Sequence, residues 1–242
     1  ALGFAANVNV NFEKRKFDEV EVFGDALGRA VLEDIKDIEY ATDLTLGVYS
    51  NTVPLPLEAP PRRHEAERIL AEERAKLSNL FGRGQDEAEI HRRRMRVEWA
   101  SELLRVASEE RDAYTADLEV QVITIGRWAL LALSAEVFAE YAEDLDELSP
   151  FEHTFPISNA NGDIGYLPTA SAFEEGGYEV DEAPRLLGAL RFQPDIEGVI
   201  RDAILEALAE AAGVPPEQLR PADEAPAEPA DAARSEAPPG AG

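Results

Sequence analysis

The spacing of apolar residues separates the start of the chain into a helical segment and an extended one. Between residues 17 and 38 apolar residues recur every three or four positions, which predicts a helix with a core-facing stripe and with Asp18 as its N-cap. Residues 41–53 are rich in β-branched and aromatic types without a helical period, which predicts a strand. Because proline cannot donate a ladder hydrogen bond, we expect Pro54 and Pro56 to close that strand.

A long charged stretch, residues 59–108, has the composition and spacing of helices. A Gly-Arg-Gly sequence at 82–84 divides it in two. Its apolar residues recur at helical spacing, which suits a helical hairpin lying on a sheet. We therefore expect a helical excursion within a larger domain.

The period changes after residue 117. Apolar and polar residues alternate over 118–122, a turn is expected at 126–127, and 128–133 is a continuous apolar run of strand length. Ser134 then has the position of an N-cap, which predicts a helix running to about Leu148.

The remainder supplies one more strand, one more amphipathic helix and a polar tail. Residues 153–158 suit a strand and 195–212 a helix, while 214–242 is rich in proline, alanine and acidic residues that cannot bury a core. We therefore expect an α/β (α+β layered) domain over 1–213, with a mixed β-sheet flanked by helices, followed by a disordered acidic tail.

Composition narrows the possible partners. The 242 residues carry a formal net charge of -26, which repels nucleic acid and anionic membranes, so we expect neither as a partner. There are no cysteines, which excludes disulfides, thiolate zinc sites and cysteine nucleophiles, and which leaves the compartment unspecified. No apolar run has the length of a transmembrane segment.

The first residues lack both Met and the basic-then-apolar plan of a signal peptide. The chain begins as though already inside a folded domain. We expect a fragment of a longer protein whose upstream half is missing.

The sequence around Glu136 allows two interpretations of this residue. It follows a buried strand and stands in the first turn of the predicted helix, where the helix dipole favours a carboxylate. Alternatively, it is aimed at a site at the junction of strand and helix, where α/β proteins place ligands.

Tyr166 lies in a loop whose backbone is restricted on both sides. Gly165 precedes it and Leu167-Pro168 follows, and Asn159 and Asn161 are expected to make side-chain turns just upstream. The hydroxyl either bonds to the local backbone beneath the loop or is presented to a ligand.

Histidine, the usual metal ligand, is scarce. His64 and His91 lie in the charged helical stretch without a second ligand at helical spacing, and His153 begins a predicted strand. The sequence contains no glycine-rich phosphate loop and no nucleophile-elbow serine.

Two stretches resemble a known family. The sequences "ALSAEVFAEYAEDL" and "SPFEHTFPISNANGDIGYLPTASAFEEGGYEV" are similar to the late catalytic-domain segment of the neutral/alkaline non-lysosomal ceramidases, and most similar to short bacterial members. The opening "AANVNVNF" resembles the family's turn that contains a catalytic serine. The likeness covers about residues 3 to 210 and is most specific from Glu136 to Val180.

The resemblance implies a zinc site. Family members are zinc amidases that cleave the N-acyl bond of ceramide, and their zinc is held by two histidines, a glutamate and a tyrosine. The glutamate corresponds to Glu136 and the tyrosine to Tyr166. The two histidines lie upstream in the family, so Zn²⁺ binding is expected to need residues that precede this chain; His64, His91 and His153 match neither.

Three positions depart from the family pattern. Asn9 stands where the family has its serine and Val10 where it has proline, and Asp163 occupies a position that tends to be aromatic in the family. An asparagine can donate a hydrogen bond to an oxyanion but cannot act as a nucleophile. Asn9 is therefore a catalytic candidate only as an oxyanion donor.

The leading hypothesis is a fragment of a zinc-dependent hydrolase that cleaves a small-molecule or lipid amide, inactive by itself. The alternative is a non-catalytic ceramidase-like scaffold that binds a ligand or a protein partner. A further interpretation makes the helical stretch 59–108 an interaction module, although its mixed charge suits an ordinary solvated surface better.

Overall fold

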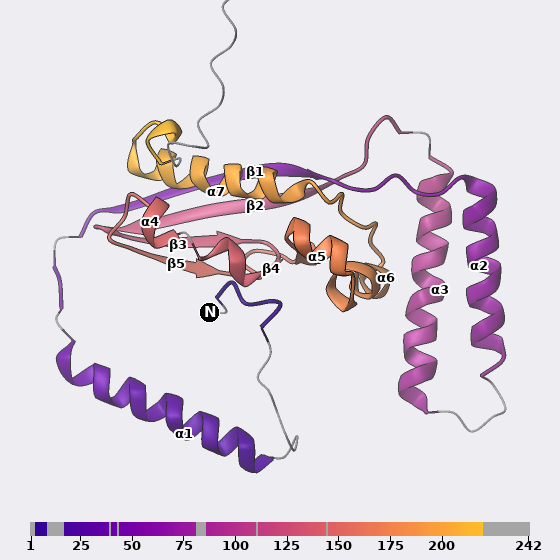
Figure 1. The fold of residues 1–242 in the computed structure, drawn as a ribbon, viewed down its shortest axis with the longest axis horizontal. Helices are drawn as coiled ribbons and strands as arrows, with labels where there is room; N and C mark the ends of the chain where they lie inside the picture. Colours follow the sequence, from indigo (N-terminus) through magenta and orange to yellow (C-terminus); the bar gives the residue numbers. More distant parts are fainter. Residues whose placement is uncertain are drawn as a thin grey trace, which may run out of the picture.

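A computed structural model describes residues 3–8, 17–38, 40–42, 44–80, 86–109, 111–143 and 145–219. At its centre is a four-stranded sheet in the order β1-β2-β3-β5 (Figure 1). The strands are β1 (Leu46–Pro56), β2 (Thr115–Ile125), β3 (Trp128–Leu133) and β5 (His153–Ile157). The first three pair antiparallel and β5 pairs parallel to β3, so the sheet is mixed. Together with the helices around it, this confirms the predicted α/β class.

The β2–β3 hairpin forms where the sequence predicts it. Gly126 adopts a φ of +59° at the turn, a conformation that glycine reaches without strain. Its N–H donates to the Thr45 carbonyl at 2.8 Å, which joins the turn to the start of β1.

One of the two prolines expected to close β1 does so: Pro56 is the last residue of the strand, whereas Pro54 lies within it. They stand opposite Thr115 and Asp117 of β2, respectively. β1 is at the edge of the described sheet, so an imino nitrogen on its free side removes no ladder hydrogen bond.

Helix α7 (Ile196–Ala212) covers one face of the sheet, lying along β1 and β2 (Figure 1). Its apolar residues recur every four positions, and Ile196, Ile200, Ile204 and Leu208 are all buried. They meet the alternate, inward-facing residues of β2, so the helical and strand periods converge on one core. Gly213, in the left-handed conformation, ends the helix as a glycine C-cap.

Short elements fill the region between β3 and α7. They are β4 (Glu136–Val137), η2 (Ala139–Tyr141), α4 (Leu145–Leu148), β6 (Tyr166–Leu167), α5 (Ala170–Glu175), η3 (Tyr178–Glu182) and α6 (Ala183–Leu187). β4 and β6 pair parallel with each other as a separate two-stranded sheet.

The helix predicted to begin at Ser134 is wrong. The Ser134 hydroxyl accepts the Glu119 N–H at 2.9 Å, so it bonds to the middle of β2, just beyond the ladder with β3, and does not cap a helix. The Glu136 N–H donates to the Gly165 carbonyl at 2.9 Å, which draws this segment into a strand pair. Helical turns appear only afterwards, in η2 and α4.

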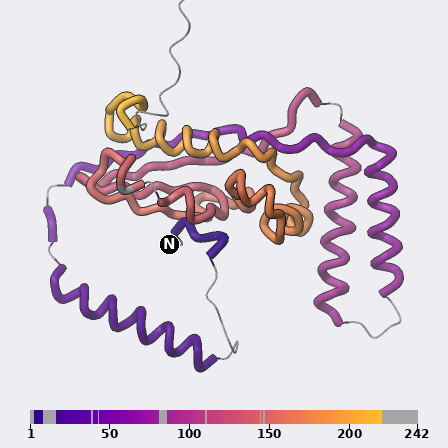
Figure 2. Tube along the Cα trace, in the orientation of Figure 1, coloured from indigo at the N-terminus to yellow at the C-terminus, as the bar shows by residue number. Residues whose placement is uncertain are grey.

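The first predicted helix forms, but its stripe does not face the core. α1 (Phe17–Asp34) continues into η1 (Ile35–Asp37), and no residue of α1 is buried. Asp18 lies inside the first turn and not at the N-cap. Figures 1 and 2 show α1 standing clear of the sheet.

The helical hairpin also forms, as α2 (Arg63–Ser78) and α3 (Glu87–Ala107), but it does not lie on the sheet. Helix α3 packs against α6 and the residues on either side of it: Trp99 Nε1–H donates to the Ala189 carbonyl, after α6, at 3.2 Å, and Arg96 pairs with Glu182 of η3. On both helices, Arg–Glu ion pairs form between residues three or four positions apart, as is typical of a solvent-exposed helix surface.

Six residues of the predicted tail are described. Pro216–Gln218 forms the 3₁₀ turn η4, and Leu219 packs against the core. The rest of the predicted tail, 220–242, lies outside the described residues.

Candidate functional site

Glu136 and Tyr166 lie directly opposite each other in the β4–β6 pair. A cleft of about 290 Å³ opens beside them. Its lining comes from three separate segments of the chain: Gly3, Ala5, Ala6, Val8, Glu136, Ser158, Asn159 and Tyr166. The two residues that the sequence singled out, 30 positions apart, therefore share one concave surface.

The loop before Tyr166 is held by its own polar groups. Asn159 and Asn161 have φ of 55° and 64°, the left-handed conformation that asparagine tolerates better than most residues. The Asp163 carboxylate accepts the Gly165 N–H at 2.8 Å, and Gly165 has a φ of +98°. These restraints explain why glycine and asparagine surround Tyr166: the backbone has to reverse tightly to place the phenol beside Glu136.

The Tyr166 phenol is kept neutral. Burial raises its pKa, and a hydrogen bond to the Glu136 carboxylate raises it further. The Tyr178 ring packs edge-on against it with centroids 6.0 Å apart. The pair thus presents a carboxylate and a phenol, two oxygen donors, at the cleft.

The N-terminal arm, residues 3–8, forms one wall of the cleft. Phe4 is buried in the core, and the Ala6 N–H donates to the Val137 carbonyl at 3.0 Å. The third predicted site residue, Asn9, lies outside the described residues. It follows Val8, which lines the cleft.

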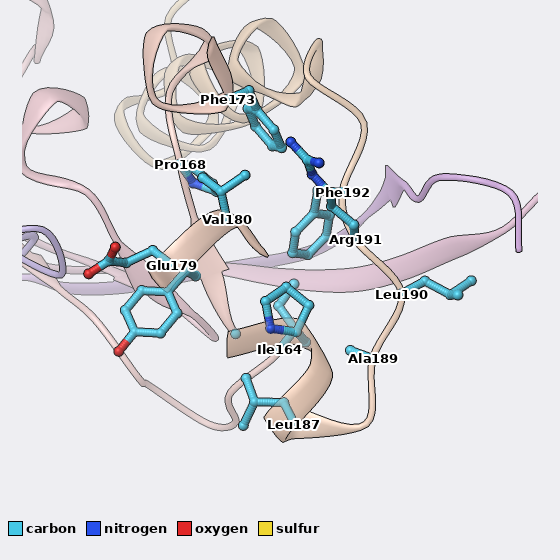
Figure 3. A pocket seen from close by; sticks show the side chains of 13 residues that line it. Ile164, Pro168, Phe173, Glu179, Val180, Leu187, Ala189, Leu190, Arg191 and Phe192 are labelled. Carbon is cyan, nitrogen blue, oxygen red and sulfur yellow. The ribbon is translucent and has the colours of Figure 1, made fainter. Parts of the chain in front are cut away.

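A second, apolar hollow adjoins Tyr166 and is drawn in Figure 3. Phe173, Val180 and Phe192 line it, and the Arg191 guanidinium stacks over the Phe173 ring at 5.4 Å. Its free space is about 10 Å³, room for one water at most. It is therefore part of the packing beneath Tyr166 and too small for a substrate.

None of the three histidines is part of the cleft lining. His64 lies in α2, His91 in α3, and His153 begins β5 with its ring 6.5 Å from those of Trp128 and Phe155. Across the described ranges, no three His, Cys, Asp or Glu side chains are grouped so that they could hold a metal ion.

Two contributors to the site carry no sequence signal that we recognised. Ser158 is buried, and its hydroxyl accepts the Val137 N–H at 3.4 Å beneath β4. Asn7 joins the N-terminal arm to Glu140 by hydrogen bonds that span 133 residues. Only the tertiary structure brings Ser158 into the cleft lining and joins Asn7 to Glu140.

Within the part of the chain that the structure describes, no helix combines the length and apolar character needed to cross a membrane.

Comparisons with known proteins find little. No protein-family model and no curated relative matches the chain. Among solved structures it is similar to the crystal structure of neutral ceramidase from Pseudomonas aeruginosa, with a TM-score of 0.36 and 16% identity. That match covers 70% of this chain and 29% of the ceramidase chain, so the chain spans less than a third of its neighbour's length. A likeness of this size carries no argument about chemistry, which has to come from the site itself.

Proposed function

We propose that this chain contributes part of the active site of a zinc-dependent hydrolase that cleaves the N-acyl bond of a ceramide-like lipid amide. The observation that carries the proposal is the juxtaposition of Glu136 and Tyr166 across the β4–β6 pair, at the edge of a cleft. The motif order around these two residues, which resembles that of the ceramidase family, supports it from the sequence side.

Glu136 and Tyr166 provide two of the four ligands that a zinc site usually has. Zinc accepts carboxylate oxygen, but it is usually four-coordinate and prefers nitrogen and sulfur ligands. Glu136 and Tyr166 would be two of the ligands, and two imidazoles, expected upstream from the family resemblance, would be the others. When bound, zinc lowers the pKa of a water molecule and polarises the acyl carbonyl.

This chain's own residues have distinct tasks in that proposal. Glu136 supplies the negative charge that a cation needs. Tyr166 supplies a phenol oxygen, which stays protonated because burial and the Glu136 carboxylate raise its pKa. Ala5, Ala6 and Val8 make an apolar wall on one side of the cleft. Asn9 would donate a hydrogen bond to the developing oxyanion.

The direct test is a zinc titration of the chain, followed by the ultraviolet difference signal of tyrosinate. Zinc that binds the Tyr166 oxygen displaces its proton, so a tyrosinate signal should appear at high zinc concentration. Two oxygen ligands make a weak site, so binding should be weak and should tighten when free imidazole is added. Tyr166→Phe should abolish the signal and Glu136→Gln should weaken it.

Tyr178→Phe is the matched control, because Tyr178 touches the Tyr166 ring but does not line the cleft. It should leave the signal intact. A titration without any Tyr166-dependent signal, with imidazole present, would reject the ligand assignment. Tight one-to-one binding without imidazole would show instead that other residues of this chain complete the site.

The same assignment ranks the effects on hydrolysis. In a longer form that includes two upstream histidines, Glu136→Ala and Tyr166→Phe should remove more N-acyl hydrolysis than Asn9→Ala. Loss of one oxyanion donor typically costs about 10²- to 10³-fold in turnover. The opposite ranking would move the chemistry away from the Glu136–Tyr166 pair.

A further inference from the structure

We infer that Asn7 and Glu140 form a positioning pair, which holds the N-terminal arm as the wall of the cleft that contains Glu136 and Tyr166. The inference rests on the proposed function only for the catalytic role of the cleft. The pairing itself rests on contacts in the described residues. Neither residue lines the cleft, so both would act through the arm.

The contact between Asn7 and Glu140 uses all of the amide's polar atoms. Asn7 Nδ2–H donates to both carboxylate oxygens of Glu140, at 3.0 and 2.9 Å. Asn7 Oδ1 accepts the backbone N–H of Ala139 at 2.9 Å. A side-chain amide that donates to a carboxylate and accepts from the adjacent backbone is fixed in orientation, and hydrogen bonds to charged groups are the stronger kind.

The arm is attached at three points, and Asn7 makes the last of these along the chain. Phe4 is buried in the core, and the Ala6 N–H is bonded to the Val137 carbonyl. Val8, directly after Asn7, lines the cleft, and Asn9 comes next. The pair therefore fixes the end of the described arm, which Asn9, the candidate oxyanion donor, follows directly in the sequence.

Glu140 reaches the pair from the element that follows Glu136. β4 holds Glu136, and η2, two residues further on, holds Glu140. One short segment thus presents one carboxylate to the cleft and another to the arm. The partners of the two are different: Tyr166 for the first and Asn7 for the second.

The chemistry of the pair allows it to be broken and restored without a change of net charge. Asn7→Asp sets two carboxylates against each other and should open the contact, and Asn7→Ala removes it without adding charge. Glu140→Gln keeps an acceptor for Asn7. The double variant Asn7→Asp with Glu140→Gln reverses the donor and acceptor and keeps the wild-type charge.

Hydrogen exchange at the Ala6 amide, which donates to Val137, measures how often the arm opens. Loss of a hydrogen-bonded contact to a charged group corresponds to about 10- to 100-fold more frequent opening. Exchange should accelerate by that factor in Asn7→Asp and Asn7→Ala, should accelerate less in Glu140→Gln, which keeps a neutral acceptor, and should return towards wild type in the double variant. The Glu136 amide, which donates to Gly165, is the internal control and should stay protected.

Access to the cleft provides a second readout, and recovery in the double variant distinguishes a specific pair from general destabilisation. Nitration of Tyr166 by tetranitromethane, followed by peptide mass spectrometry, should be faster in Asn7→Asp and Asn7→Ala than in the wild type. It should be slower again in the double variant. Tyr40, which is 92% exposed, serves as the reference and should react equally in all.

Equal exchange at Ala6 and equal nitration of Tyr166 across all variants would overturn the inference. So would a double variant as open as Asn7→Asp alone, because the two residues would then not act as a pair. The zinc titration distinguishes this outcome from failure of the proposed function: Tyr166 can give its zinc signal whether or not the arm is held, and the arm can be held by Asn7 in a protein that binds no zinc.

Discussion

Helices α1 and α7 have similar lengths and similar spacing of apolar residues, but α7 is buried against the sheet and α1 is exposed. Both are 17 or 18 residues long, and both carry apolar residues every three or four positions. α7 lies against β1 and β2 and buries Ile200 and Leu208 completely, whereas Leu27 of α1 stays 69% exposed. An apolar stripe therefore shows which side of a helix is suited to burial, but it does not show whether another surface covers it.

The central sheet repeats the contrast between its two faces. Leu118, Val120 and Val122 of β2 point towards α7 and are buried. On the opposite face, one cross-strand row runs from Val48 through Ile123 and Leu130 to Phe155. Val48 is 70% and Phe155 50% exposed, so apolar residues on this face are only partly covered.

The largest expected effect comes from truncating the covered helix. Leu208→Ala removes a fully buried side chain from α7 and leaves a cavity, which should lower the free energy of unfolding by about 2–5 kcal/mol. Leu27→Ala in α1 is the matched change and should stay within about 0.5 kcal/mol. Urea unfolding of both variants measures the difference. Equal losses would mean that α1 is packed as tightly as α7.

The two faces of the sheet can be compared with one substitution. Val122→Thr places a hydroxyl in the core under α7, which should cost about 1–3 kcal/mol because the group loses its water. Val48→Thr makes the same change on the other face, in the neighbouring strand, and should be nearly neutral. Thermal unfolding followed by circular dichroism reports both, and a clear loss from Val48→Thr would show that this face is covered in solution.

Glycine positions separate helix formation from packing. A Cβ added at Gly24 of α1 or Gly198 of α7 meets no atom within 4 Å, so alanine fits at both. Gly198→Ala should raise the free energy of unfolding by about 0.5–1 kcal/mol through helix propensity. Gly24→Ala should raise helix content without moving the main unfolding transition, because α1 contributes no buried residue to the core. A shift of that transition by Gly24→Ala would contradict the comparison.

The smallest effect is expected at the C-terminus. Removal of residues 220–242, a polar segment without apolar period, should leave the melting temperature unchanged. A cut after Gly213 also removes Leu219, which packs against the core, and should lower stability slightly. Differential scanning calorimetry of the two truncated chains tests the order. A clear loss of melting temperature on removal of 220–242 alone would mean that the acidic segment docks.

Local patterns were enough to predict most elements. The alternation before Gly126 and the apolar run after it define the β2–β3 hairpin, and α7 and β5 lie where the periods place them. Glu136 and Tyr166 were selected from their position beside strand ends and from the family-like motif order, and the structure sets them opposite each other. Their role as zinc ligands stays a prediction.

The errors have a common cause, which is that neighbours in space decide what a local signal means. Ser134 has the sequence of a helix cap, yet its hydroxyl is used by Glu119 of a strand that lies 15 positions earlier. Pro54 resembles a strand terminator, yet an edge position tolerates it. Asn7 carries no local signal, because its partner Glu140 is 133 positions away.

The sequence by itself determined the periods, the turns and the two residue types that meet at the cleft, because these depend on side chains a few positions apart and on backbone conformations that glycine, proline and asparagine impose. The tertiary structure decided which apolar stripes are covered, where β1 ends, and how the arm with Asn7 closes one side of the cleft. Those outcomes depend on contacts between segments distant in sequence, and a local pattern contains no information about the surface that will be placed against it.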